Sequence, residues 1–130
     1  MYLNNNSLTK VSALHIAEFI DYSDIKLKEL GLKWNEINGV GGIAIAEALE
    51  NNKFLKILDL SWNNIGRTET YMSKGLIGKT WGKALKENKT LVHLDLGFNK
   101  IEEADTKIFA EDIKKNQTCI GIHYQGNTSS

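Results

Sequence analysis

The chain has 130 residues, 16 basic and 16 acidic residues that cancel to a formal net charge of zero, one cysteine and no proline. A hydrophobic content of 42% in this length fits one ordinary folded domain, and it excludes a chain that is disordered by composition. One cysteine excludes a disulfide framework, zero charge argues against nucleic acid as a partner, and no apolar run approaches the ~18 residues of a membrane span.

The chain opens on a short apolar pair, Met1 and Leu3, followed by an asparagine, Asn6, three residues after the leucine. This segment is polar and rich in asparagine, so it is not a signal peptide, and we expect a cytoplasmic protein. Apolar residues at helical spacing follow, among them Ile16, Phe19 and Ile20.

The next segment, 27–37, carries the pattern L-x-x-L-x-L-x-x-N-x-I, which recurs in full at 55–65 and 91–101. A weaker copy of the pattern lies at 119–127, and the first residues of the chain fit the second half of the pattern. The asparagines of the five copies are spaced by 29, 28, 36 and 28 residues; they are Asn6, Asn35, Asn63, Asn99 and Asn127. This regularity predicts an internal repeat along the whole chain.

Each stretch between two signatures is predicted to be a helix. Residues 41–49 place Ala44, Ile45, Ala48 and Leu49 at helical spacing, and segments around 80–85 and 108–113 hold the same position in later repeats. Each repeat is therefore a short strand, a turn and a helix.

This pattern resembles the leucine-rich repeat, and its period of 28–29 residues with an alanine-rich helix resembles the ribonuclease-inhibitor-like subclass, as in NOD-like receptors. The resemblance implies an α/β horseshoe solenoid with parallel strands on the concave face and helices on the convex face. Residues 1–130 would form a single domain of about four to five repeats.

The asparagines have a structural interpretation first. A buried amide both donates and accepts, so the five signature asparagines are predicted to form a structural ladder that satisfies backbone groups of the turns. Asn52, Asn88 and Asn116 precede the repeats by three residues, and we expect left-handed helix caps there.

Residues between the strand leucines are predicted to line the concave face, and the candidates for partner binding there are Lys33, Lys56, Asp59, His93, Asp95 and His123. Two carboxylates and two histidines are possible metal ligands. Leu-Asp-Leu is common in strands of this family, so we favour a polar patch for a protein partner and expect no metal site.

Aromatic residues precede three of the signature asparagines: Trp34, Trp62 and Phe98. They are predicted to form a column at the edge of the sheet. Two interpretations are equally supported. The column is either a ladder that covers the turns or a binding hot spot for a partner, where Trp is enriched.

The longest spacing between signatures indicates an eight-residue insertion within residues 66–80, which holds Arg67 and Tyr71 as further candidates for partner binding. Insertions in repeat proteins often lie on the binding face. The segment Ser73–Thr80 differs from the phosphate-binding pattern G-x-x-x-x-G-K-[ST] at one residue, because Ser73 stands where the pattern has its first glycine. It also follows no apolar strand, so nucleotide binding is not expected.

Together these features predict a non-catalytic protein-protein interaction module with no cofactor, a protein partner, and no role for nucleic acid or membrane. The alternative is a regulatory subunit acting on a GTPase, for which Arg67 is the one favourable feature, or a fragment of a larger sensor or receptor.

The outermost strands of a solenoid expose unpaired backbone groups, which pair readily with other strands. Three interpretations of the ends stay open: part of a longer array, an end-to-end oligomer, or a minimal solenoid with frayed ends. We expect self-association, measured by size-exclusion chromatography with light scattering. A strict monomer at high concentration would count against pairing of the ends.

Overall fold

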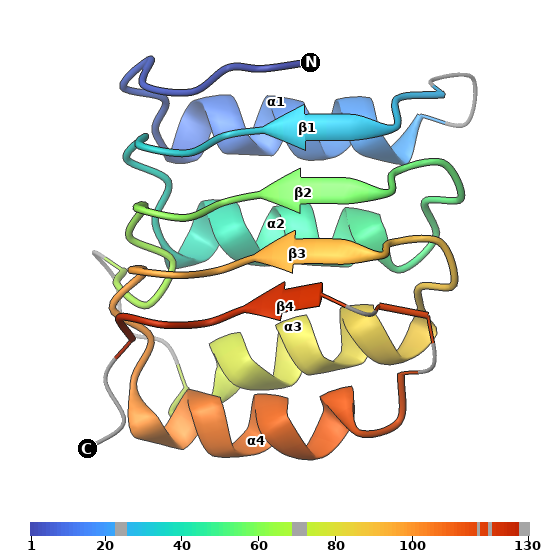
Figure 1. Ribbon diagram of the computed structural model, residues 1–130. Coiled ribbons are helices and arrows are strands. Elements are labelled where there is room, and N and C mark those ends of the chain that lie inside the picture. Colours follow the sequence, from blue (N-terminus) through green and yellow to red (C-terminus); the bar gives the residue numbers. More distant parts are fainter. Residues whose placement is uncertain (23–25, 69–72, 117, 120, 128–130) are drawn as a thin grey trace.

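The computed structural model describes residues 1–22, 26–68, 73–116, 118–119 and 121–127. Strands and helices alternate along the chain (Figure 1), and the order of elements is α1 (Lys10–Asp21), β1 (Glu29–Gly31), α2 (Gly39–Leu49), β2 (Ile57–Asp59), α3 (Leu76–Glu87), β3 (His93–Asp95), α4 (Glu103–Ile113) and β4 (Gly121–His123). The predicted alternation of strand, turn and helix is confirmed.

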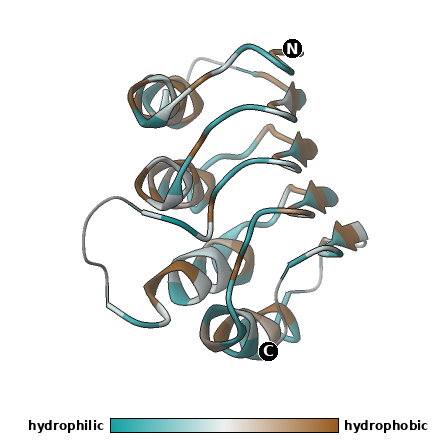
Figure 2. Cartoon of the chain, turned by 90° about the vertical axis from the view of Figure 1, so that its left-hand side faces the viewer, coloured by the Kyte–Doolittle hydropathy of each residue, from teal (hydrophilic) through white to brown (hydrophobic). Residues whose placement is uncertain are grey.

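The four strands form one parallel sheet in the order β1-β2-β3-β4. Its register joins equivalent positions of the repeats: Leu30 pairs with Leu58, Leu58 with Leu94 and Leu94 with Ile122. The first residues add a bridge between Tyr2 and Gly31 on the outer side of β1. Strands make one layer and helices the other (Figure 2). We call the sheet surface away from the helices the concave face.

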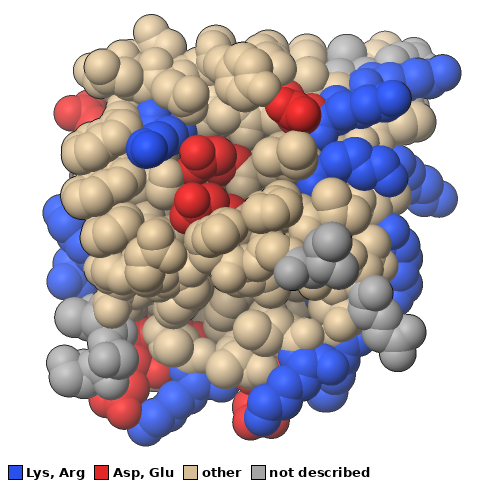
Figure 3. All heavy atoms as spheres, viewed as in Figure 1, with Lys and Arg blue, Asp and Glu red and all other residues tan. Residues whose placement is uncertain are grey.

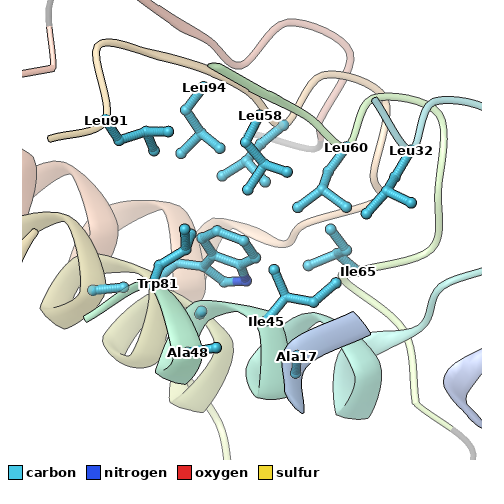
Figure 4. Close-up of a cluster of buried hydrophobic side chains, with 14 of the residues drawn as sticks. Ala17, Leu32, Ile45, Ala48, Leu58, Leu60, Ile65, Trp81, Leu91 and Leu94 are labelled. Carbon is cyan, nitrogen blue, oxygen red and sulfur yellow. The ribbon is translucent and has the colours of Figure 1, made fainter. Parts of the chain in front are cut away.

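The core lies between these two layers. Each of β1, β2 and β3 points one leucine inward because side chains alternate, and a second leucine follows just after the strand; for β2 these are Leu58 and Leu60, 1% and 0% exposed. Ile122 and Tyr124 hold these two places at β4. Helix residues close the core from the other side (Figure 4), where Ile45 and Trp81 lie under the strand leucines. A single repeat exposes its leucines, so burial depends on stacking.

The signature asparagines bind backbone groups of two repeats at once. Asn63 Nδ2 donates to the Leu60 carbonyl of its own repeat at 3.0 Å and to the Leu32 carbonyl of the preceding repeat at 2.9 Å. Its Oδ1 accepts from the Ile37 amide at 3.1 Å. The same bridging pattern recurs at Asn35, Asn99 and Asn127. Each asparagine therefore fastens its repeat to the one before it.

Asn6 differs from the other four. It is exposed, and its Nδ2 donates only to the Asn4 carbonyl, at 3.1 Å, among the described residues. Asn35 instead takes the bridging role for this end, since its Oδ1 accepts from the Asn6 and Leu8 amides.

A second asparagine ladder lies at the opposite edge of the sheet, and it corrects the expectation of left-handed caps. Asn88 follows α3 with φ −71° and ψ 132°, which is extended backbone. Its Oδ1 accepts from the Thr90 and Leu91 amides, while Nδ2 donates to the Leu49 carbonyl of the preceding helix at 2.8 Å. Asn52 and Asn116 make equivalent bonds, and neither has a positive φ. These asparagines therefore serve to bond one repeat to the preceding one, and they do not form left-handed helix caps.

Tyr124 anchors α4 to the last strand. Its ring stacks on Phe109 with centroids 5.3 Å apart, and its hydroxyl lies 2.8 Å from Thr106 Oγ1. Burial raises the pKa of the Tyr124 phenol to about 12, because the charged form loses hydration; the Thr106 hydrogen bond opposes this and the Asp105 charge adds to it.

Replacing Asn63 by Ala should lower the free energy of unfolding by on the order of 2–4 kcal/mol, because buried carbonyl and amide groups of two repeats lose their partner. Urea unfolding followed by circular dichroism measures this. Asn6→Ala is the matched control and should change stability by less than about 0.5 kcal/mol. Equal losses in the two variants would contradict the bridging role.

The raised pKa of Tyr124 makes stability depend on alkaline pH. The native state keeps this proton between pH 10 and about 12 while the unfolded chain releases it, so stability falls as pH rises through this window. Ultraviolet difference titration should show one tyrosine ionising near 12 that is absent in Tyr124→Phe. A titration curve unchanged by the substitution would contradict the assignment.

Candidate interaction surface

Three aromatic rings stack at the edge of the sheet where the strands end. The Trp34 and Trp62 ring centroids lie 4.4 Å apart with planes 8° from parallel, and those of Trp62 and Phe98 lie 4.1 Å apart at 6°. We call these residues the aromatic column. Trp34 is 50% exposed and Trp62 37%, whereas Phe98 is half-buried. Both indoles therefore remain partly open to solvent.

The backbone positions these rings. Trp34, Trp62 and Phe98 have φ of 59°, 59° and 56°, a left-handed conformation that costs energy for a residue with a side chain. A hydrogen bond to the next repeat holds each turn: the Trp34 amide donates to Ser61 and the Trp62 amide to Gly97, at 3.1 and 2.9 Å. The ring positions are thus set before any partner arrives.

A glycine ends the column. The Phe98 ring lies over Gly126, where a Cβ atom would collide with it, and Gly126 itself has φ 80°. Glycine meets both demands, since it has no Cβ and adopts positive φ readily.

Two carboxylates lie side by side on the concave face, because Asp59 and Asp95 are register partners on β2 and β3. Asp59 Oδ1 accepts from the Ser61 amide and hydroxyl at 2.9 and 2.7 Å, and Asp95 Oδ1 accepts from the Gly97 amide at 2.9 Å. No described lysine or arginine forms an ion pair with either.

The turn-capping role of these carboxylates was missed from the sequence. An Asp whose side chain binds the amide two residues later is a common turn motif. This turn motif could have been predicted from Asp59 two residues before Ser61 and from Asp95 two residues before Gly97.

Two histidines stack beside the carboxylates. The His93 and His123 ring centroids lie 5.2 Å apart at 21°, and the His93 ring covers Gly121. Among the described residues, no group of three or more His, Cys, Asp or Glu is placed to hold a metal ion.

The remaining candidates are dispersed. Lys33 is half-buried on the concave face, and Lys56 is exposed at the start of β2. Arg67, at the aromatic edge, directs its guanidinium to Glu102 at 2.8 Å and to the Lys100 carbonyl at 3.4 Å. It lines a hollow of about 650 Å³. Tyr71 lies outside the described residues. In the part of the chain that is described, no helix is long and apolar enough to cross a bilayer.

Comparisons with known proteins agree with this architecture. A family model described as Leucine Rich repeat matches residues 23–46, 51–67 and 87–103. A search of the curated proteins gave no match. The chain resembles the solved structure named Leiomodin-1 Actin-Binding Site 2 (ABS2), with a TM-score of 0.79 and 22% identity, covering 95% of this chain and 68% of that one. Such an identity shows the fold alone, and the ribonuclease-inhibitor-like subclass stays a prediction. The chain carries leucine-rich repeats and folds as an α/β leucine-rich-repeat solenoid.

Proposed function

We propose that this solenoid is a non-catalytic protein-interaction module that binds its partner with the aromatic column and the adjoining concave face. The exposed stack of Trp34 on Trp62 carries the proposal. Tryptophan is among the residues that dominate binding energies at protein interfaces.

The stack has the physical properties of a binding hot spot. Its rings are fixed by stacking and by left-handed turns, so little side-chain entropy is lost when a partner covers them. A ladder that only covers the turns has no need of an indole that is half exposed, as Trp34 is. The exposed indole edges therefore favour the binding role over the covering role.

The concave face supplies charge for specificity. Asp59 and Asp95 are held in place by turn amides, and each has a second carboxylate oxygen with no hydrogen bond among the described residues. Charged groups across an interface select partners more than they add affinity. We therefore propose that the column supplies affinity and the carboxylates with Lys33 supply selectivity.

The GTPase-regulating alternative is less well supported. A regulatory arginine has to reach a nucleotide on the partner, whereas the Arg67 guanidinium is engaged by Glu102 within its own chain. The contribution of the insertion to binding stays part of the proposal.

Trp62→Ala should weaken capture of the partner by about tenfold or more while the fold is retained. The measurement is affinity capture with mass spectrometry, followed by titration of each captured protein. Monomeric and filamentous actin are included as defined probes, because the similar solved structure is an actin-binding site.

Phe19→Ala is the matched control, since Phe19 on α1 is 38% exposed and Trp62 37%. It should leave binding within about twofold, as expected for surface residues outside an interface. Thermal unfolding of both variants separates binding from stability. If the two variants bind every captured protein equally, the aromatic column is not the interface.

A further inference from the structure

The zero net charge conceals an uneven layout. The four connections that lead from a helix to the next strand (22–28, 50–56, 88–92 and 114–120) hold seven lysines and two acidic residues, Asp24 and Glu50. Asp24 lies outside the described residues. The helices hold five lysines and eight acidic residues, and the strands hold three acidic residues and no lysine or arginine. Positive charge therefore gathers along one edge of the sheet, opposite the aromatic column (Figure 3).

We call the seven residues the lysine edge: Lys26, Lys28, Lys53, Lys56, Lys89, Lys114 and Lys115. All seven are exposed. Within the described residues only Lys114 forms an ion pair, with Glu111 at 3.2 Å. Glu50, the acidic residue described at this edge, pairs with Lys83 of α3 at 3.7 Å instead. Among the described residues, six of these seven lysines thus have no ion-pair partner.

Lys28 and Lys56 form its centre. They hold the same position in consecutive repeats, and the Lys56 amide donates to the Lys28 carbonyl at 2.7 Å. The two backbones are therefore adjacent, and like charges at neighbouring positions repel. A ligand with negative charge would relieve that repulsion.

Helix dipoles do not account for this pair. A helix end attracts lysine within its last turn, whereas α1 and α2 end at Asp21 and Leu49, each seven residues before the lysine. No described acidic side chain pairs with Lys28 or Lys56. Neither a helix dipole nor an ion pair among the described residues therefore accounts for these two lysines.

We propose that the lysine edge binds an acidic stretch of a partner protein, with Lys28 and Lys56 as its central contacts. This inference rests on the proposed function, because it names the chemistry of the same module's partner. A protein segment fits better than a duplex or an anionic bilayer. Glu29, Asp59 and Asp95 lie on the adjoining strands and would repel any ligand that is negative over a wide area.

The test uses a fluorescent decaglutamate peptide at low ionic strength, with a decaglutamine peptide as the uncharged reference. The variant Lys28→Glu/Lys56→Glu should weaken decaglutamate binding by about tenfold or more, because repulsion replaces attraction. Lys79→Glu/Lys107→Glu makes the same change in net charge on the helices and should weaken it by less than about threefold. Equal losses would show that net charge alone governs binding and would overturn the inference.

Two further arms decide the remaining outcomes. The single variant Lys56→Glu should unfold at an equal or higher temperature, since it places an opposite charge beside Lys28; a lower temperature would show a structural role and overturn the inference. Tighter binding to duplex DNA or to phosphatidylserine vesicles than to decaglutamate would also overturn it.

Trp62→Ala separates this inference from the proposed function. It should retain decaglutamate binding, because the aromatic column lies at the other edge of the sheet. If Trp62→Ala does not change the capture of protein partners, the proposed function fails. The inference about the lysine edge is still decided by the decaglutamate measurements.

Discussion

The structure depends on asparagine side chains that satisfy the backbone of two repeats at once. Where a strand ends and the chain bends, carbonyls such as Leu32 and Leu60 have no sheet partner, and Asn63 binds both. An unpaired buried group costs about 1–3 kcal/mol, so one side chain removes several such costs. The bond to Leu60 lies within one repeat, whereas the bond to Leu32 joins two repeats and forms only when they stack.

The same constraint operates at both edges of the sheet. At the helix-to-strand edge, Asn88 reaches the Leu49 carbonyl of the preceding helix while it caps its own connection. The two ladders fix the repeats of β2, β3 and β4 at both ends of the strand, and the leucines fill the space between. Strands of three residues suffice because backbone bonds between repeats continue past them, as from the Trp34 amide to Ser61, and the asparagines bind carbonyls such as Leu32 and Leu60.

The sequence predicted the features that recur in every repeat. It predicted less well the contacts that a side chain makes with a neighbouring repeat. Spacing alone placed the strand leucines and the signature asparagines correctly in register. It assigned Asn88 a local left-handed cap, because a bond to the preceding helix has no signal within one repeat. Spacing also placed Trp34 and Trp62 in one column, but ring overlap at 4.4 Å depends on left-handed turns that only the folded chain displays. The pairing of Arg67 with Glu102 joins an insertion to a later connection, and no spacing encodes it.

Stacking in register also explains why side chains of one kind form lines across the sheet. A residue type retained at one position of the repeat becomes a line across the sheet, with neighbours about 4.8 Å apart. Aromatic rings line one edge, lysines line the other, and Asp59 with Asp95 lies between them. Under the proposed function, a partner that spans the strands would match an apolar line, a negative pair and a positive line in that order. Such an ordered pattern would select partners by charge and shape together, although the net charge of the chain is zero.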